Sequence, residues 1–173
     1  MSAPRDRRSG KGATEVLRAD LRAPDPRLEA ELRRRLDEVE EGLRGAVASD
    51  IALVRSASSH LLGAGGKRFR PMLVVLGGRF GPRPEDASIV DGAVATELTH
   101  LASLHHDDVI DEADTRRGIA SVNARWGNTV AVLTGDFLFA RASQIAAALG
   151  ADASRLLAAT IAAVCEGQIL ELQ

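Results

Sequence analysis

Apolar residues recur every three or four positions along this chain from residue 26 onwards, and this period constrains the fold more than any other feature. The first such segment forms one stripe of an amphipathic helix, with Leu28, Leu32, Leu36, Val39, Leu43 and Val47. No stretch of useful length alternates apolar and polar residues as a half-buried strand does, and the sequence contains no internal repeat. The pattern therefore predicts an all-α protein, a bundle of long helices without a sheet.

Glycine and proline residues divide this pattern into separate helices. Pro26 suits the first turn of one helix, Ser49 with Asp50 suits a cap, and Gly150 separates the last two helices. The predicted helices cover about residues 26–47, 50–62, 71–80, 86–111, 128–149 and 152–173. Residues 1–24 lack an apolar period and are predicted to be a mobile polar tail, and residues 114–127 are predicted to be irregular.

Composition narrows the class of protein further. The formal net charge is -2, so no overall basic character indicates a nucleic-acid partner. The single cysteine, Cys165, excludes an internal disulfide framework and is predicted to be a small buried apolar residue in a reducing compartment. No apolar run approaches the length of a membrane span, and charges occupy the N-terminus where a signal peptide has an apolar segment. These observations predict a soluble, cytoplasmic protein.

Three aspartates, Asp107, Asp108 and Asp111, lie near the end of the fourth predicted helix. Positions i and i+4 share one helical face, so Asp107 and Asp111 point together while Asp108 lies about 100° away. Two such carboxylates suit Mg²⁺, which keeps several waters and completes its shell with phosphate oxygens. Taken alone, the motif is equally compatible with a solvated acidic helix end.

Two basic clusters accompany the aspartates. The segment Gly65-Gly66-Lys67-Arg68-Phe69-Arg70-Pro71 is a glycine turn that leads into a helix, where backbone amides, Lys67 and Arg70 can hold phosphate oxygens. Arg116 and Arg117 follow the aspartates within one loop. Each cluster alone is compatible with an ordinary basic loop. Together with the carboxylates they predict a composite site for Mg²⁺ and diphosphate.

His100 lies seven residues before Asp107, so the two side chains project within about 20° of one helical face. A single histidine on a helix is more often a packed residue, but this face leads to the aspartates. We therefore predict that His100 is a donor that faces a diphosphate. His60, His105 and His106 lack this argument and are interpreted as structural.

The motifs GGKRFRP, ELTHLASLHHDDVIDEADTRRG and GDFLFARAS resemble those of the trans-isoprenyl diphosphate synthases, the polyprenyl synthetase family, over about residues 26–173. The resemblance implies long helices around a deep central cavity, commonly in a homodimer, and Mg²⁺ as cofactor. It implies a prenyltransferase that condenses isopentenyl diphosphate with an allylic prenyl diphosphate by Mg-assisted ionisation. The implied product is a medium- or long-chain polyprenyl diphosphate.

The resemblance also implies roles for individual residues. Asp107 and Asp111 match the metal ligands, Asp108 matches the middle member of that catalytic motif, and Arg116 matches a contact to the allylic diphosphate. The positions implied to hold isopentenyl diphosphate are Gly66, Lys67, Arg70, His100 and Arg117. Ala102 and Ser103, five and four residues before Asp107, match positions that limit product length, and their small side chains imply a long product.

The family carries a second aspartate-rich motif on a later helix, and none follows Asp111 here. We therefore expect the N-terminal half of the isoprenoid synthase fold, inactive alone and completed by a homodimer or by a chain that supplies the missing half. The helix face with Leu98, Leu101 and Leu104, and the inward stripe of residues 128–149, are expected to pack against missing helices. The alternatives are a non-catalytic subunit or truncated gene product that binds a partner synthase, and a terpene cyclase, which has no use for GGKRFRP.

Overall fold

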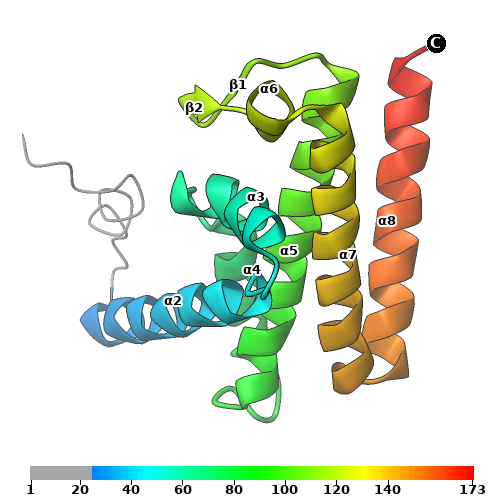
Figure 1. Ribbon diagram of the computed structural model, residues 1–173. Coiled ribbons are helices and arrows are strands. Elements are labelled where there is room, and N and C mark those ends of the chain that lie inside the picture. Colours follow the sequence, from blue (N-terminus) through cyan, green and yellow to red (C-terminus); the bar gives the residue numbers. More distant parts are fainter. Residues whose placement is uncertain (1–24) are drawn as a thin grey trace, which may run out of the picture.

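The computed structural model describes residues 25–173, which form helices joined by short loops and one small hairpin (Figure 1). The elements are α2 (Pro26–Ala46), α3 (Ala52–Gly63), α4 (Phe69–Gly78), α5 (Ala87–Ile110), β1 (Thr115–Arg116), β2 (Ile119–Ala120), α6 (Val122–Trp126), α7 (Asn128–Leu149) and α8 (Ala151–Glu171). The predicted all-α class and long helices are confirmed. The predicted tail over residues 1–24 lies outside the described residues.

Residues 114–127, predicted to be irregular, instead contain two short strands and the helix α6. Thr115 pairs with Ala120 and Arg116 with Ile119 in an antiparallel ladder, so the prediction of no sheet is wrong at this point. Arg117 and Gly118 form the two-residue turn, with φ values of 53° and 79°. Two positive φ angles match the right-handed twist of a tight hairpin. The strands on either side are only two residues long, which is too short to leave an alternating pattern in the sequence.

The long helices α2 and α5 begin at side-chain caps, whereas α7 and α8 begin at Gly127 and Gly150 without one. The Asp25 carboxylate accepts a hydrogen bond from the Arg27 amide at 2.9 Å, and Pro26 occupies the first turn of α2. The Asp86 carboxylate accepts from the Ser88 amide at 3.0 Å and starts α5. These caps fix where each helix begins, so that α5 carries one continuous face from its start to Asp107.

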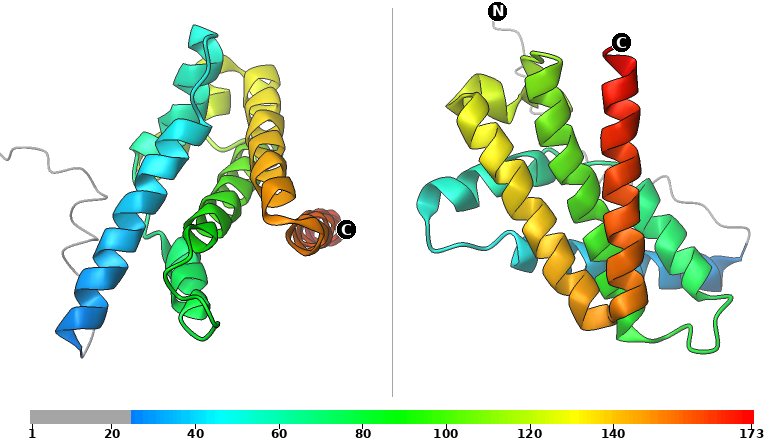
Figure 2. Two further views of the ribbon diagram at one scale, coloured as in Figure 1. Left: turned by 90° about the horizontal axis from the view of Figure 1, so that it is seen from below. Right: turned by 90° about the vertical axis from the view of Figure 1, so that its right-hand side faces the viewer.

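The core lies between α5 and α7, with α2, α3 and α4 packed on one side and α8 beyond α7 at the outer edge (Figure 2). Leu98 and Leu101 of α5 are fully buried against Leu138 of α7 and Val39 of α2 within this core. The expectation that Leu98 and Leu101 await helices missing from the chain is therefore wrong. The inward stripe of α7 is likewise buried, because it packs against α5.

Close approach of α5 and α7 depends on Gly135, within the motif GDFLFARAS. A Cβ atom at this position would lie 2.4 Å from Nε2 of His106 and 3.2 Å from the carbonyl oxygen of Ala102. Contacts this short would force the helices apart or displace His106. Gly135 therefore brings the aspartate-bearing end of α5 against α7.

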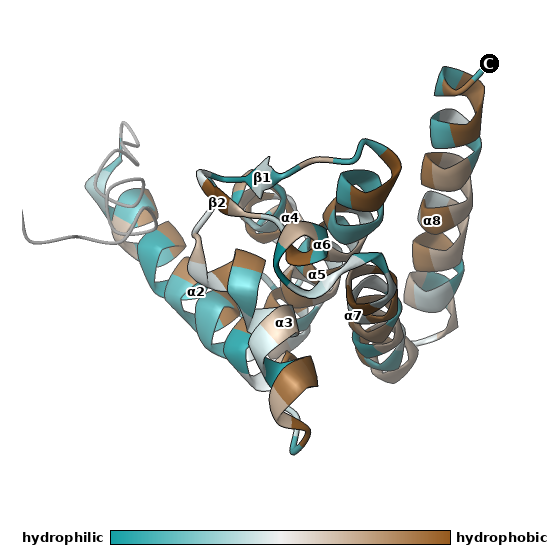
Figure 3. Cartoon of the chain, turned by 45° about the horizontal axis from the view of Figure 1, so that its top comes forward, coloured by the Kyte–Doolittle hydropathy of each residue, from teal (hydrophilic) through white to brown (hydrophobic). Residues whose placement is uncertain are grey.

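The helix α8 is the least buried element of the described chain. None of its residues is buried, and Leu156, Ile169, Leu170 and Leu172 are exposed large apolar residues (Figure 3). By length and composition both α7 and α8 could cross a membrane, so the statement that no apolar run approaches that length is wrong. Alanine and leucine fill both helices with few interrupting charges, and α7 is a core helix of this bundle.

Candidate functional site: a cavity with a charged end

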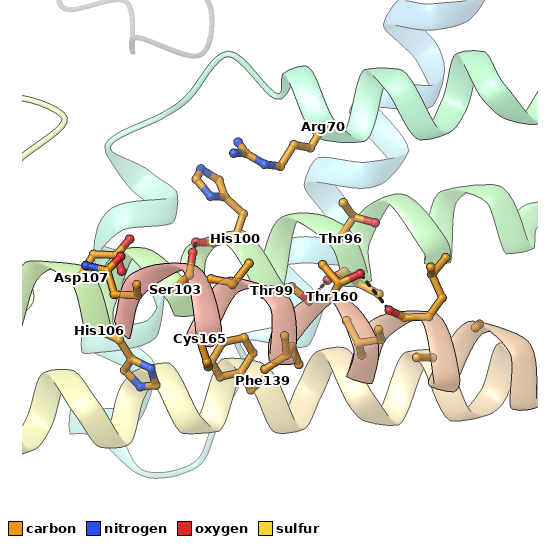
Figure 4. Close-up of a pocket in the computed structure, with 18 of the residues that line it drawn as sticks. Arg70, Thr96, Thr99, His100, Ser103, His106, Asp107, Phe139, Thr160 and Cys165 are labelled. Carbon is orange, nitrogen blue, oxygen red and sulfur yellow. Dashed lines mark hydrogen bonds between the residues drawn. The ribbon is translucent and has the colours of Figure 1, made fainter. Parts of the chain in front are cut away.

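A cavity of about 790 Å³ lies between α4 and α5 on one side and α7 and α8 on the other (Figure 4). One stripe of α5 lines it, from Asp107 through Ser103, His100 and Thr99 to Thr96. Arg70 of α4, His100 and Asp107 gather at one end, and α7 and α8 contribute mostly apolar side chains along its length. The cavity therefore has a charged end and a long apolar interior.

Asp107 and Asp111 stand at the charged end. Asp107 lines the cavity, and the amide of Asp111 donates to the Asp107 carbonyl at 2.8 Å across the last turn of α5. Burial raises the pKa of Asp107, and the neighbouring charge of Asp111 raises it further. Two carboxylates that repel each other fit a cation that brings its remaining ligands as water and phosphate oxygens. Within residues 25–173 no group of three or more His, Cys, Asp or Glu forms a complete protein-only metal site.

Asp108 lies in the interior beneath the cavity wall and is fully buried. Its Oδ1 atom accepts a hydrogen bond from Nε of Arg116 at 2.6 Å, and Nη2 of the same guanidinium lies 2.5 Å away in an ion pair. Burial raises the pKa of Asp108, while the Arg116 guanidinium opposes that rise. Asn123 donates to the Asp108 carbonyl oxygen at 3.1 Å. Asp108 therefore ties the hairpin, and with it Arg116, to the end of α5.

The glycine-rich basic segment is held by an arginine that the sequence interpretation left without a role. Arg68 adopts a left-handed conformation, φ 48°, and its side chain is only 5% exposed. Its Nε donates to Glu40 at 2.5 Å, and its Nη1 donates to Glu97 at 3.0 Å. Glu40 and Glu97 were detectable as charges beside the apolar positions Val39 and Leu98, where a charge needs a buried partner. This network fixes Lys67 and Arg70 on either side of Arg68.

Arg117 reaches the same segment from the hairpin. Its Nη1 donates to the carbonyl oxygens of Leu61, at 3.2 Å, and Gly65. A Cβ atom on Gly66 would lie 2.7 Å from Nη1 of Arg68 and 2.9 Å from Nη1 of Arg117, so two guanidinium groups pass close to this glycine. Burial lowers the pKa of Arg117, and the charge of Arg68 lowers it further. Such crowding of cations favours a bound anion.

His100 lines the cavity between the aspartates and Arg70, as its helical position predicts. Burial lowers its pKa to about 4, and the charges of Arg70 and Arg117 contribute to that shift. The imidazole is therefore neutral at pH 7 and offers one N–H donor. Arg70 also lines the cavity, whereas the side chain of Lys67 is exposed beside the segment and does not line the wall.

The other histidines differ from one another. His106, interpreted as structural, lines the cavity, and its Nε2 lies 3.1 Å from the Val132 carbonyl oxygen and 3.3 Å from Oδ1 of Asp136. These two contacts join α5 to α7, so His106 packs the two helices together and also borders the site. His105 is fully buried, and burial lowers its pKa to about 4. His60 bonds the carbonyl oxygen of Ala120 at 2.7 Å and supports the hairpin.

Of the two predicted product-length positions, only Ser103 lines the cavity. Ala102 is fully buried on the face of α5 that meets Gly135 of α7. Cys165, predicted to be buried, is instead exposed and lines the cavity from α8, a helix in which none of the residues is buried. The helical period alone did not distinguish the cavity face from the core face of α5, since both are apolar.

The polyprenyl synthetase family model matches residues 51–173 of this chain. The chain is 44% identical over 156 residues to the nonaprenyl diphosphate synthase of Mycobacterium tuberculosis, covering 90% of this chain and 43% of that protein. It is 48% identical over 136 residues to heptaprenyl diphosphate synthase component 2 of Geobacillus stearothermophilus, covering 78% of this chain and 42% of that protein.

A solved structure supports the same relation. The geranylgeranyl pyrophosphate synthase of Corynebacterium glutamicum, complexed with calcium and isoprenyl diphosphate, superposes with a TM-score of 0.77 at 41% identity. The match covers 88% of this chain and 46% of that one. The chain belongs to the polyprenyl synthetase family and spans less than half the length of these relatives.

Proposed function

We propose that this chain supplies the first metal-binding half of a prenyl diphosphate synthase, which condenses isopentenyl diphosphate with an allylic prenyl diphosphate. The observation that carries the proposal is the cavity itself, which joins Asp107, His100 and Arg70 at one end to a long apolar interior. A prenyl diphosphate likewise has a charged end, the diphosphate, and a long apolar hydrocarbon tail. The names of the relatives, which are polyprenyl diphosphate synthases, agree with this class of substrate.

Asp107 and Asp111 would hold Mg²⁺ at the charged end, and a bound ion would supply the positive charge that a leaving diphosphate of the allylic substrate needs. Arg116, held by Asp108, would contact the same diphosphate and stabilise the negative charge that grows on it. Lys67, Arg70, His100 and Arg117, with the backbone at Gly66, would bind isopentenyl diphosphate. Asp108 and Arg68 would act as positioning residues, because each holds an arginine or a loop rather than the substrate.

The completed enzyme would require the rest of the fold. This chain spans 43% of the nonaprenyl diphosphate synthase that it matches, so activity of the whole protein is expected only when a further segment, a second copy or another chain completes the cavity. A subunit that binds a partner synthase remains the second candidate, because one relative is named as component 2 of a heptaprenyl diphosphate synthase. Membership of this family disfavours a terpene cyclase. A cytoplasmic location remains a prediction.

Titration calorimetry of an unreactive allylic thiolodiphosphate, with and without Mg²⁺, tests the proposal. Asp107→Asn should abolish the Mg²⁺-dependent part of binding and leave binding of isopentenyl diphosphate intact, because only the metal ligand changes. Arg70→Ala should show the reverse bias. Asp91→Asn is the matched control, since Asp91 is an exposed carboxylate on the same helix and does not line the cavity. Equal weakening of both ligands by Asp107→Asn would contradict the assignment.

A further inference from the structure

The end of the cavity opposite Asp107 is bounded by three residues from three helices: Gly92 of α5, Val74 of α4 and Leu149 of α7. A Cβ atom at position 92 would lie 3.7 Å from Cγ1 of Val74 and 4.0 Å from Cδ1 of Leu149. Both distances are ordinary van der Waals contacts. Gly92 therefore sits where α4 and α7 converge on α5, and an added side chain would enter the cavity end.

Neither backbone geometry nor helix packing requires glycine at this position. Gly92 is not among the described glycines with positive φ, and its added Cβ would meet no atom closer than 3.7 Å. Two other glycines differ in this respect. A Cβ added to Gly42 would lie 2.8 Å from Val94, and a Cβ added to Gly78 would lie 2.6 Å from Ile89. Glycine inside a helix is less stable than alanine. The effect of having glycine at position 92 is therefore additional space at this end of the cavity.

The wall between Asp107 and Gly92 is more apolar than its sequence suggests. Three threonines line the cavity, Thr96 and Thr99 on α5 and Thr160 on the facing helix α8. Their hydroxyls donate to carbonyl oxygens of their own helices, those of Gly92, Ala95 and Leu156 respectively, each at 2.8 Å. The Ser103 hydroxyl donates to the His100 carbonyl at 2.9 Å. These hydroxyls satisfy their donors within the helix, so the wall can accept a hydrocarbon.

The length of the wall suits a long tail. Gly92 and Asp107 are fifteen positions apart on α5, and at the rise of an α-helix this distance is about 22 Å. We infer that Gly92, with Val74 and Leu149, forms the floor of this cavity, and that the missing side chain at position 92 sets how long a prenyl tail the cavity accepts. This inference rests on the proposed function, since it takes a prenyl chain as the ligand.

Cys165 offers a readout that does not depend on catalysis. It is the only cysteine of the sequence, it is exposed, and it lines the cavity. A tail in the cavity should slow its alkylation by N-ethylmaleimide. The experiment measures the ligand concentration that halves this rate for prenyl alcohols, and for prenyl diphosphates with Mg²⁺, of increasing tail length.

The variants are Gly92→Leu, Gly92→Ala, Leu149→Ala and the control Gly77→Leu. Gly77 lies on α4, is exposed, and its added Cβ would meet no atom of the described chain within 4 Å. In the wild type, longer tails should bind progressively more tightly. Gly92→Leu should weaken the longest tails about tenfold or more and leave the shortest unchanged, Gly92→Ala should have a smaller effect, and Leu149→Ala should favour longer tails. Circular dichroism checks that each variant is folded.

The outcomes distinguish failure of the inference about Gly92 from failure of the proposed function. If Gly92→Leu and Leu149→Ala both keep the wild-type dependence on tail length, the inference about the floor is overturned. If alcohols bind with the expected length dependence but diphosphates with Mg²⁺ bind no better, the floor stands and the proposed function fails. If no prenyl ligand protects Cys165 in the wild type, both are overturned.

Discussion

Arg68 is the residue whose loss should most damage both the fold and the site. Its side chain is 5% exposed and joins Glu40, 9% exposed, to Glu97, 3% exposed. Removing one partner of a buried ion pair costs about 3–5 kcal/mol, because an uncompensated charge is left inside the protein. Arg68→Ala leaves two carboxylates, but burial already raises the pKa of Glu97, and Arg68 is the main group that opposes this rise. Glu97 can therefore take up a proton in the variant. Because this relieves one of the two stranded charges, the free energy of unfolding should fall by no more than about 3–5 kcal/mol.

Urea unfolding followed by far-UV circular dichroism measures this loss. With a slope of about 1–3 kcal/mol per molar urea, the midpoint of Arg68→Ala should fall by roughly 1–5 M at pH 7. The deficit should shrink at pH 5, where protonation of Glu97, whose pKa is already raised by burial, costs less. Arg34→Ala is the control, because Arg34 pairs with Glu38 and Glu85 at the surface, where solvent screens the pair, and its midpoint should stay close to that of the wild type. A deficit for Arg68→Ala that is equally small, or equal at both pH values, would refute the reasoning.

Two further predictions concern packing and pH. Gly42→Ala should destabilise the fold by about 1–3 kcal/mol, because its Cβ would lie 2.8 Å from Val94, whereas Gly45→Ala, with no neighbour within 4 Å, should stabilise it by up to about 1 kcal/mol; thermal unfolding that ranks them otherwise would contradict the packing. Burial lowers the pKa of His105 to about 4, below its unfolded value of about 6.5, so its contribution to stability is present above pH 6.5 and lost as pH falls towards 4. In the wild type, this histidine should lower the free energy of unfolding by about 2 kcal/mol at pH 5 relative to pH 7, and His105→Leu should abolish that decrease. If the urea midpoint of His105→Leu depends on pH as in the wild type, His105 is not the group responsible.

The helices of this chain were predictable because their signals are local. The apolar period of α2, the cap at Asp86 and the break at Gly150 each depend on neighbours within a turn or two. The hairpin was not predictable in this way, since its strands are two residues long and its turn uses Arg117 at a positive φ. A left-handed arginine leaves no composition signal, because its conformation is imposed by bonds to Leu61 and Gly65 far away in the sequence.

The residues of the site also fall into those that local spacing predicted and those that depend on packing between distant segments. Asp107, His100 and Arg70 were brought together by helical spacing and by motif, and all three line the cavity. The partners that hold the site, Arg68 and Glu97, are distant in sequence and became visible only once α2, α4 and α5 were packed. For the same reason Ala102 and Ser103, adjacent in sequence, face the core and the cavity respectively.

The threonines that bond back to their own helices have a consequence for how this wall can change over evolutionary time. Thr96, Thr99 and Thr160 line the cavity with their hydroxyl donors satisfied inside the helix, so replacement by valine, which has nearly the same shape, would leave the lining chemically similar. Descendants of this gene could therefore drift between the two residues without a new substrate preference. At Gly92, by contrast, an added side chain would occupy the end of the cavity, so under the inference drawn above one codon there would be enough to separate two lineages by the length of the tail that the cavity accepts.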